Sequence, residues 1–421
     1  MRTAIIASVF ILIFAAIVAA SYFAHGHNYR RAASDADPYA GVFLPILPAD
    51  TDTDDEPAAG YPHDYEYQEY NNQYNGYESY SNESNTYEPY VQEPDIHESD
   101  AHEPDTQDSD IHNEPPNIVT ISISAAGDTT LGGDRRWAGY HAFMREFENS
   151  GRDHSHFLRN VAHIFRESCL AILNLEGTLT YATEHMDKQF VFRGPPHFAR
   201  ILSSSYVDVV TISNNHTIDF HQIGYEDTRR ALTAEGIVYF GNEFKTIMEV
   251  NGIKVGMFGY RIWQDSAYNR SRIRAAIYDL RDRGAQLVIA YFHWGVEREN
   301  MPEQYQIDIG RYTIRNGADL VLGAHPHVIQ GIEEYMGRFI VYSLANFSFG
   351  GNANPPDQDS FIFQQTFSFY NGVLLPDIDK NLIPIFVSSV RTHNDFVPTI
   401  AEGEDAERIL ARIERYSQWL R

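Results

Sequence analysis

The chain contains a single cysteine, Cys169, among its 421 residues. One cysteine cannot form an intrachain disulfide, so the sequence excludes the disulfide-rich folds of small secreted proteins. No cysteine lies near the amino-terminal apolar segment, which also excludes the lipid attachment of bacterial lipoproteins. The folded part must therefore be held together by its hydrophobic core, with or without help from metal ions.

Lysine and arginine are absent from residues 35–114, where 22 Asp and Glu are interleaved with Tyr, Asn, Ser and Pro and few core-forming aliphatic residues. This composition predicts a disordered acidic spacer over residues 28–117. Residues 118–421 carry 36 acidic and 29 basic side chains, a net charge of −7 against −26 for the whole chain. The folded part therefore lacks the basic surface that nucleic-acid binding requires, and we expect no nucleic-acid partner.

Ahead of the spacer, an apolar run over Ala4–Ala20 follows a single arginine. It predicts a membrane-targeting segment within residues 1–27. We favour an uncleaved anchor, which makes the chain a single-pass protein of the cell membrane with residues 118–421 outside the cytoplasm. The alternative is a signal peptide cleaved near Val18-Ala19-Ala20, which would release a secreted protein, and two arginines beyond the run weaken the charge argument for orientation.

From residue 118 onward, hydrophobic strands alternate with amphipathic helices, as is typical of an α/β fold. Five predicted strands end in side chains of the kinds that bind metal ions. These residues are Asp128, Glu176, Asn215 with His216, His293, and His325 with His327. Each of them alone is better explained as a turn or capping residue. Ligands of α/β sheets, however, bind beyond the carboxyl ends of the strands, which is where all five positions are expected.

The strongest of these strand ends carries His325 and His327. The run 320–322 has the continuous hydrophobicity of a strand that is buried on both faces, and Gly323 permits a sharp turn after it. Pro326 fixes φ between the two imidazoles, so the pair forms a rigid His-x-His clamp. The alternative is that these histidines only cap a core strand through hydrogen bonds.

The mixture of imidazole, carboxylate and amide ligands without thiolate suits zinc, manganese or iron. The number of ligands exceeds one tetrahedral site, so we expect two divalent metal ions. A pair of ions about 3.5 to 4 Å apart can clamp both oxygens of a displacement at phosphorus. Asn215 offers a neutral oxygen ligand, and His216 beside it offers a general acid or base.

The chain carries an ordered series of motifs: Gly127-Asp128, Asn174-Leu175-Glu176, Asn214-Asn215-His216 with Asp219, His293-Trp294-Gly295, Gly317-Ala318-Asp319, Gly323-Ala324-His325-Pro326-His327-Val328 and Tyr342-Ser343-Leu344-Ala345-Asn346-Phe347. Over about residues 118–400 this series resembles the CapA family of bacterial poly-gamma-glutamate capsule biosynthesis proteins. That family is related to the calcineurin-like metallophosphoesterases. The resemblance implies a metallophosphoesterase-like four-layer α/β/β/α sandwich over residues 118–421, with a two-metal site at the strand ends.

The resemblance also implies a role for each candidate residue. The first metal would be bound by Asp128 and His327, the second by Asn215, His293 and His325, with Glu176 as the bridging carboxylate. His216 would donate a proton to the leaving group. One departure is clear: the phosphoesterase first motif is Asp-x-His, whereas Asp128-Thr129-Thr130 has no histidine. The first metal is thus short of a ligand, and a mononuclear or weakly loaded site is the alternative.

Two further residues are candidates for substrate binding. Arg193 offers a guanidinium fork that matches phosphate or carboxylate, or else it pairs with a surface acid. Trp294 is predicted to line the cleft, or else to belong to the core. Two smaller departures from capsule proteins are Gly133, where they often have arginine, and Ala345, where they usually have glycine.

Two function classes remain. The first is a metal-dependent hydrolase, tethered outside the membrane, that acts on a phosphoester or on the amide bonds of an exported polymer. The second is a non-catalytic accessory subunit that holds an anionic polymer beside a membrane-bound capsule polymer synthase. Both classes use the metal site, and only turnover of a substrate separates them.

Overall fold

The computed structural model describes residues 118–376 and 379–420. The predicted anchor (1–27) and spacer (28–117) lie outside the described residues. Within the part of the chain that is described, no helix combines the length and the hydropathy needed to cross a membrane. The described residues form a mixed α/β fold with several sheets, which confirms the α/β part of the predicted fold class.

The larger sheet has nine strands and is centred on β1 (Ile118–Thr130). β1 pairs in parallel with β2 (Leu170–Leu175) and, near its end, with β13 (Asn346–Phe349), and it pairs antiparallel with β14 (Asp359–Tyr370). The other strands are β5 (Val209–Thr211), β6 (Val238–Phe240), β15 (Val373–Leu374), β16 (Lys380–Phe386) and β17 (Thr399–Ile400). Strands β1, β2, β5 and β6 are parallel, so their carboxyl ends share one edge.

The second sheet has six strands in the order β11-β12-β10-β9-β8-β7. Its parallel strands are β8 (Ile253–Ile262), β9 (Leu287–Trp294), β10 (Leu320–Ala324) and β12 (Arg338–Val341). The two edge strands, β7 (Thr246–Val250) and β11 (Ile332–Tyr335), run antiparallel to their neighbours. A separate two-stranded ribbon joins β3 (Thr178–Leu179) and β4 (Arg193–Gly194).

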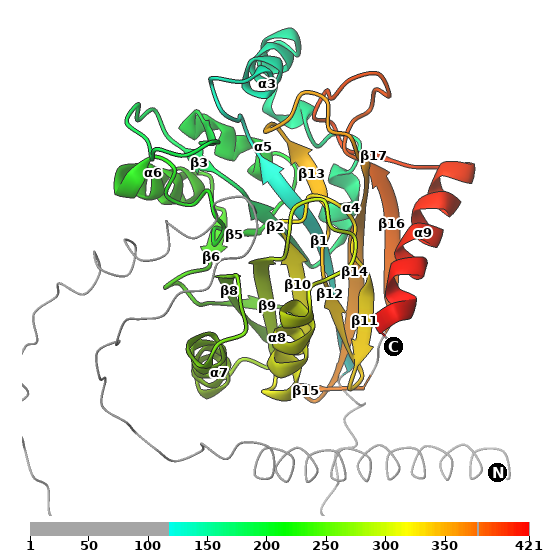
Figure 1. Cartoon of the computed structure of the whole chain (residues 1–421). Helices are drawn as coiled ribbons and strands as arrows, with labels where there is room; N and C mark the ends of the chain where they lie inside the picture. Colours follow the sequence, from blue (N-terminus) through cyan, green and yellow to red (C-terminus); the bar gives the residue numbers. More distant parts are fainter. Residues whose placement is uncertain (1–117, 377–378, 421) are drawn as a thin grey trace, which may run out of the picture. The chain divides into compact units, whose positions relative to one another are not determined.

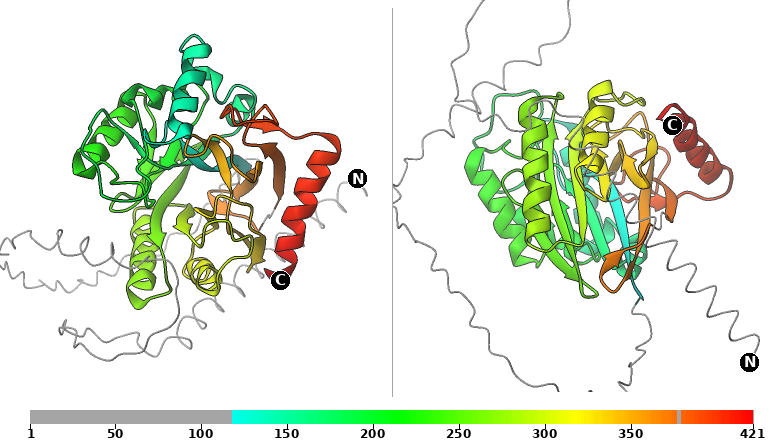
Figure 2. Two further views of the ribbon diagram at one scale, coloured as in Figure 1. Left: turned by 45° about the horizontal axis from the view of Figure 1, so that its top comes forward. Right: turned by 90° about the horizontal axis from the view of Figure 1, so that it is seen from below.

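The two large sheets face each other across a shared hydrophobic cluster, to which β1, β2 and β14 contribute from one side and β9, β10 and β12 from the other. Helices cover the two outer faces (Figures 1 and 2). The nine-stranded sheet packs against α3 (Ala138–Asn149), α4 (Ala162–Glu167), α5 (Ala199–Ser203) and α6 (His221–Ala234). The six-stranded sheet packs against α7 (Ala267–Asp282) and α8 (Gln304–Arg315). Short 3-10 helices cover His154–His156, Pro196–Phe198 and Gln418–Leu420.

The last helix, α9 (Gly403–Ser417), runs along β16 in Figure 1. Its buried residues Ile409 and Ile413 belong to the cluster between the sheets, so α9 closes one edge of that core. The carboxylate of Asp359 on β14 accepts hydrogen bonds from Arg408 and Arg412 of α9. α9 is therefore a packing element.

Strand parity determines which side chains reach the space between the sheets. In β9, Leu287, Ile289 and Tyr291 face the other sheet, whereas Val288, Ala290, Phe292 and Trp294 face the helices. Because successive side chains on a strand point to opposite faces, His293 faces the gap between the sheets. In β2, Leu170 and Ile172 face the same gap, and Asn174 has the same parity. Both sheets therefore direct polar side chains into one region beyond their cores.

Candidate metal centre

Asp128 reaches the gap between the sheets through a β-bulge. Ala126 pairs with Leu173 and Asp128 pairs with Asn174, so Gly127 is an extra residue in β1. A side chain on Gly127 would collide with the chain at β13, because its Cβ would lie 1.9 Å from the carbonyl oxygen of Ala345. Glycine is thus required for space, and the bulge turns Asp128 toward the other candidate ligands.

Glu176 lies at the centre of the candidate site. Its side chain is fully buried, and neither carboxylate oxygen has a hydrogen-bond partner among the described residues. The ring Nε2 atoms of His216 and His293 each lie 3.8 Å from Oε1, and that of His327 lies 4.0 Å away. Burial, and then the charge of Asp128, raise the pKa of Glu176 well above its ordinary value. A buried carboxylate without hydrogen bonds is costly unless a cation compensates it.

Two groups of side chains that could hold a metal ion share Glu176. One group joins it to Asp128 and His327, and the other joins it to His293 and His325. Within each group the ligand atoms lie within 4.8 Å of one another. A third group combines the exposed Glu297 with His325 and His327. The prediction of a metal-binding site is supported by these groups, and their donors fit a divalent ion.

In the first group, His327 Nδ1 lies 3.0 Å from Asp128 Oδ2. Asp128 also accepts hydrogen bonds from the backbone amide of His325 at 3.1 Å and from Asn174 Nδ2 at 2.7 Å. Burial favours the neutral ring of His327, but the charge of Glu176 and the hydrogen bond to Asp128 outweigh it and raise the pKa of His327 to about 10. The two carboxylates therefore favour positive charge at this position, which a bound cation would also supply.

In the second group, His293 Nε2 lies 2.8 Å from Asn215 Oδ1, so the predicted amide ligand is next to the predicted imidazole ligand. Burial, and then the neighbouring His325 and His327, lower the pKa of His293 well below its ordinary value. The neutral ring is the form that binds metal ions. The indole of Trp263, which the sequence reasoning did not single out, packs edge-on against His325 with ring centroids 4.7 Å apart.

The two clamp histidines have unusual backbone conformations. His325 has φ of 99° and His327 has φ of 59°, both in the left-handed half of the map that non-glycine residues rarely occupy. Such conformations cost roughly 1 to 3 kcal/mol each and gather at binding and catalytic sites. Ala345 also has a positive φ, 59°, a conformation that favours glycine, the residue that the resemblance to capsule proteins led us to expect here.

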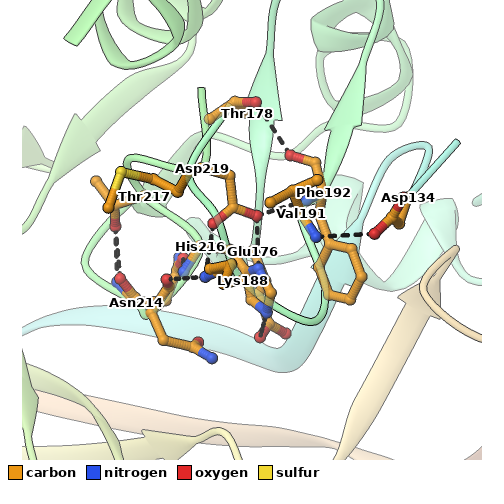
Figure 3. A network of polar contacts seen from close by, with 12 residues as sticks. Asp134, Glu176, Thr178, Lys188, Val191, Phe192, Asn214, His216, Thr217 and Asp219 are labelled. Atoms are coloured by element: carbon orange, nitrogen blue, oxygen red, sulfur yellow. Dashed lines mark hydrogen bonds and ion pairs between the residues drawn. The ribbon is translucent and has the colours of Figure 1, made fainter. Parts of the chain in front are cut away.

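His216 belongs to a network of buried polar contacts beside the two groups (Figure 3). Its Nδ1 donates to Asp219 Oδ2 at 2.6 Å, and the other oxygen of Asp219 lies 2.7 Å from Lys188 Nζ. The ring stacks on Phe192 with centroids 4.0 Å apart. Burial lowers the pKa of His216, although Asp219 opposes this effect. The ring is thus held at Nδ1 and presents Nε2 toward Glu176.

Asn214 has a scaffolding role at the same turn. Its Nδ2 donates to the carbonyl oxygen of Leu175 at 2.8 Å, and its Oδ1 accepts from the backbone amide of His216 at 3.0 Å. Its neighbour Asn215 is the asparagine that faces His293.

Of the two candidates for substrate binding, Arg193 lines a small pocket together with Glu176, and Trp294 lies away from the ligand groups. Trp294 is fully buried, donates from Nε1 to the carbonyl oxygen of Tyr342 at 2.8 Å, and packs among α7 and α8. Successive side chains of a strand point to opposite faces, so Trp294 faces away from His293. Trp294 therefore belongs to the core, the alternative given above, and does not line the cleft. Arg193 is largely buried, with its guanidinium over the ring of Phe220 and Nη1 3.3 Å from the carbonyl oxygen of Tyr181.

Comparison with known proteins adds a family to this geometry. The family described as bacterial capsule synthesis protein PGA_cap matches residues 122–351. The PGA biosynthesis protein CapA of Bacillus subtilis (strain 168) is 27% identical over 262 residues, which are 56% of this chain and 66% of that protein. The capsule biosynthesis protein CapA of Bacillus anthracis is 27% identical over 186 residues, 39% of this chain and 45% of that protein.

The chain thus covers just under two thirds of the length of the first relative and just under half of the length of the second. A solved structure of a hypothetical protein from Thermus thermophilus superposes with a TM-score of 0.36 at 14% identity. The superposition covers 63% of this chain and 99% of that one.

Proposed function

The chain belongs to the PGA_cap family of bacterial capsule synthesis proteins, and from this premise we propose that it is a metal-dependent hydrolase of capsule or exopolymer biosynthesis. Its substrate would be a phosphoester or the amide bonds of an anionic polymer such as poly-gamma-glutamate. We further propose that the two facing sheets with helices on both outer faces are the four-layer sandwich of the calcineurin-like metallophosphoesterases.

The main support for this proposal is the environment of Glu176. It is a fully buried carboxylate without a hydrogen-bond partner among the described residues, and it is shared by two groups of candidate ligands. A structural glutamate in a protein interior is normally hydrogen-bonded, so this arrangement is better explained by a bridging ligand between two cations. The proposal therefore assigns two ions to the site, manganese, zinc or iron, in agreement with the donor types.

Each ion would be held by side chains from both sheets. The first would be bound by Asp128 and His327, the second by Asn215, His293 and His325, and both by Glu176. Bound divalent ions would supply Lewis-acid polarisation of a phosphoryl or carbonyl oxygen. Because the ligands come from strands of two different sheets, the packing of the sheets fixes the distances between them.

His216 would move the proton in this reaction. Its Nδ1 is occupied by Asp219, so Nε2 is the atom that exchanges a proton with substrate. When the ring is protonated, Nε2 could give its proton to the leaving group. Phe192 covers one face of the ring.

The second candidate function is a non-catalytic accessory subunit that binds an anionic polymer beside a membrane synthase. The observation that favours it is Asp128-Thr129-Thr130, which lacks the histidine of the phosphoesterase motif. Turnover by the purified full chain separates the two. We expect manganese-dependent release of nitrophenol from bis(4-nitrophenyl) phosphate, or cleavage of poly-gamma-glutamate. Full metal loading without turnover of either substrate would contradict the hydrolase and favour the accessory role.

We also propose that the folded domain works outside the cytoplasmic membrane, held there by the apolar segment at residues 4–24. The support is the sequence pattern and the family's connection with an exported polymer. Protease added to intact protoplasts should then degrade the domain. Full protection of the domain, with degradation only after lysis, would contradict this topology.

A further inference from the structure

We propose that the side-chain oxygen of Asn346 is the ligand that completes the first metal position, in place of the histidine that this chain lacks after Asp128. The inference rests on the proposed metal centre and adds a residue to it. Without this histidine, the first position has only Asp128, His327 and the shared Glu176. Thr130, which occupies the position of the histidine, has a buried hydroxyl without a hydrogen-bond partner among the described residues.

The sheet register places Asn346 beside Asp128. β13 pairs in parallel with the end of β1, and Asn346 is the partner of Asp128 in that ladder. Side chains of paired residues in neighbouring strands project from the same face of the sheet. Asn346 is largely buried, so its amide faces the candidate centre and not solvent. The backbone reinforces the pairing, because the amide of Asp128 donates to the carbonyl oxygen of Ala345 at 2.9 Å.

The distances among the donor atoms fit a shared ion. His327 Nδ1 lies 3.0 Å from Asn346 Oδ1 and 3.0 Å from Asp128 Oδ2. A ring nitrogen carries one hydrogen and cannot donate two straight hydrogen bonds. Two donor atoms that bind one ion at right angles, with bonds of about 2.1 Å, lie about 3.0 Å apart. The three atoms are therefore close enough to share one ion, which would take the place of the proton on Nδ1.

The orientation of the amide is fixed by a second contact. Asn346 Nδ2 donates to the backbone carbonyl oxygen of His327 at 3.3 Å, which directs Oδ1 toward the ring nitrogen. Asn346 therefore contacts His327 through both ends of its amide, with the donor on the main chain and the acceptor at the candidate centre. The oxygen is the end that can bind a cation.

The assignment predicts different metal preferences for the two positions. The first position would present oxygens from Asp128, Glu176 and Asn346 with one imidazole, whereas the second has two imidazoles. Carboxylate and carbonyl oxygens favour manganese, and imidazole suits zinc. The first position therefore has the harder set of donor atoms and should take up Mn²⁺.

The test is a titration of the full-length protein with Mn²⁺ after chelation, followed by calorimetry and by the EPR signal of bound manganese. Asn346→Ala should weaken one of the two binding steps by more than about 100-fold, beyond the roughly 10- to 100-fold typical of outer-shell partners. Asn346→Asp keeps an oxygen ligand and should keep both steps. Asn381→Ala is the matched control, because Asn381 is an exposed strand asparagine, and it should bind as the wild type does.

A double-mutant cycle shows whether Asn346 is itself a ligand or only orients His327. In the His327→Ala background, Asn346→Ala should weaken manganese binding further by at least about tenfold. No further loss there would overturn the inference, as would unchanged binding by Asn346→Ala alone. A loss in Glu297→Gln but not in Asn346→Ala would assign the position to Glu297 instead. If the wild type itself binds no divalent ion, the proposed function fails and the inference fails with it.

Discussion

His216 is the residue on which proton transfer depends, since Asp219 and Phe192 fix its ring and leave Nε2 at the centre. His216→Ala should keep its metal content and lose about 10² to 10⁴ in turnover, the usual contribution of a general acid. Metal analysis and steady-state kinetics on the same sample check both parts. His141→Ala, at an exposed position on α3, is the control and should change neither. A variant that lost its metal together with turnover would show that His216 is a ligand instead.

At this scale the sequence predicted most of the candidate site. Strand ends followed by His, Asn, Asp or Glu were sufficient to select Asp128, Glu176, Asn215 and the clamp histidines, because the carboxyl ends of parallel strands converge. Asn346 lies in one of the sequence motifs, but the sequence predicted no role for it, because its position depends on the pairing of β13 with β1. That pairing is a long-range contact, and local sequence does not reveal it.

Gly127 lies where β1 contacts β13, so a substitution there would change the packing of these two strands. Gly127→Ala would place a methyl group against the carbonyl of Ala345 and push the strands apart. We expect a loss of about 1 to 3 kcal/mol in unfolding free energy, typical of overpacking, together with weaker metal binding because Asp128 moves. Urea unfolding and manganese titration provide the two measurements.

The matched control is Gly252→Ala, where an added Cβ meets nothing within 4 Å but φ is 78°. It should cost about 1 kcal/mol through backbone strain and leave manganese affinity unchanged. Equal losses of metal affinity in both variants would contradict the role of Gly127 in positioning Asp128.

The attachment of α9 to β14 depends on Asp359. Burial raises the pKa of Asp359, but hydrogen bonds from Arg408 and Arg412 outweigh it and hold the pKa below the ordinary 3.8. A carboxyl whose folded pKa is depressed contributes stability above its unfolded pKa, and the contribution disappears as the pH falls through the folded value. Asp359→Asn should therefore lose about 1 to 3 kcal/mol at neutral pH. The difference from the wild type should shrink below pH 3.8.

Urea unfolding at several pH values checks this dependence. Asp405→Asn is the control, because Asp405 pairs with the same Arg408 through an exposed side chain and should cost less than about 1 kcal/mol. A wild-type advantage over Asp359→Asn that stayed constant down to pH 3.0, about one unit below the ordinary carboxyl pKa, would contradict the account.

Several elements were not predicted, although their signals were present. α7 buries Ile273, Ile277 and Leu280, at helical spacing, but polar residues dominate the rest of the helix. β14 alternates between buried phenylalanines and partly exposed polar residues, the pattern of a strand with one face on the core.

At the scale of the whole described domain, the centre exists because two sheets bring their strand ends together. Asp128 and Glu176 come from one sheet, and His293, His325 and His327 come from the other. Local sequence predicted the strands, but which strands share a sheet and how the sheets face each other depend on packing between distant residues such as Ile172 and Ile289. The arrangement of the two sheets was expected only from the resemblance to a family. The amino-acid composition did not predict it.

The most direct test of the central claim is the metal content of the full-length protein after chelation, reloading with manganese and desalting. The account predicts about two ions per chain for the wild type, as in two-metal hydrolases, and clearly fewer for His325→Ala and for His327→Ala. Each substitution removes one ligand that the strand end of β10 delivers. Equal metal content in all three folded proteins, or no metal in the wild type, would contradict the claim that this constellation is a metal centre.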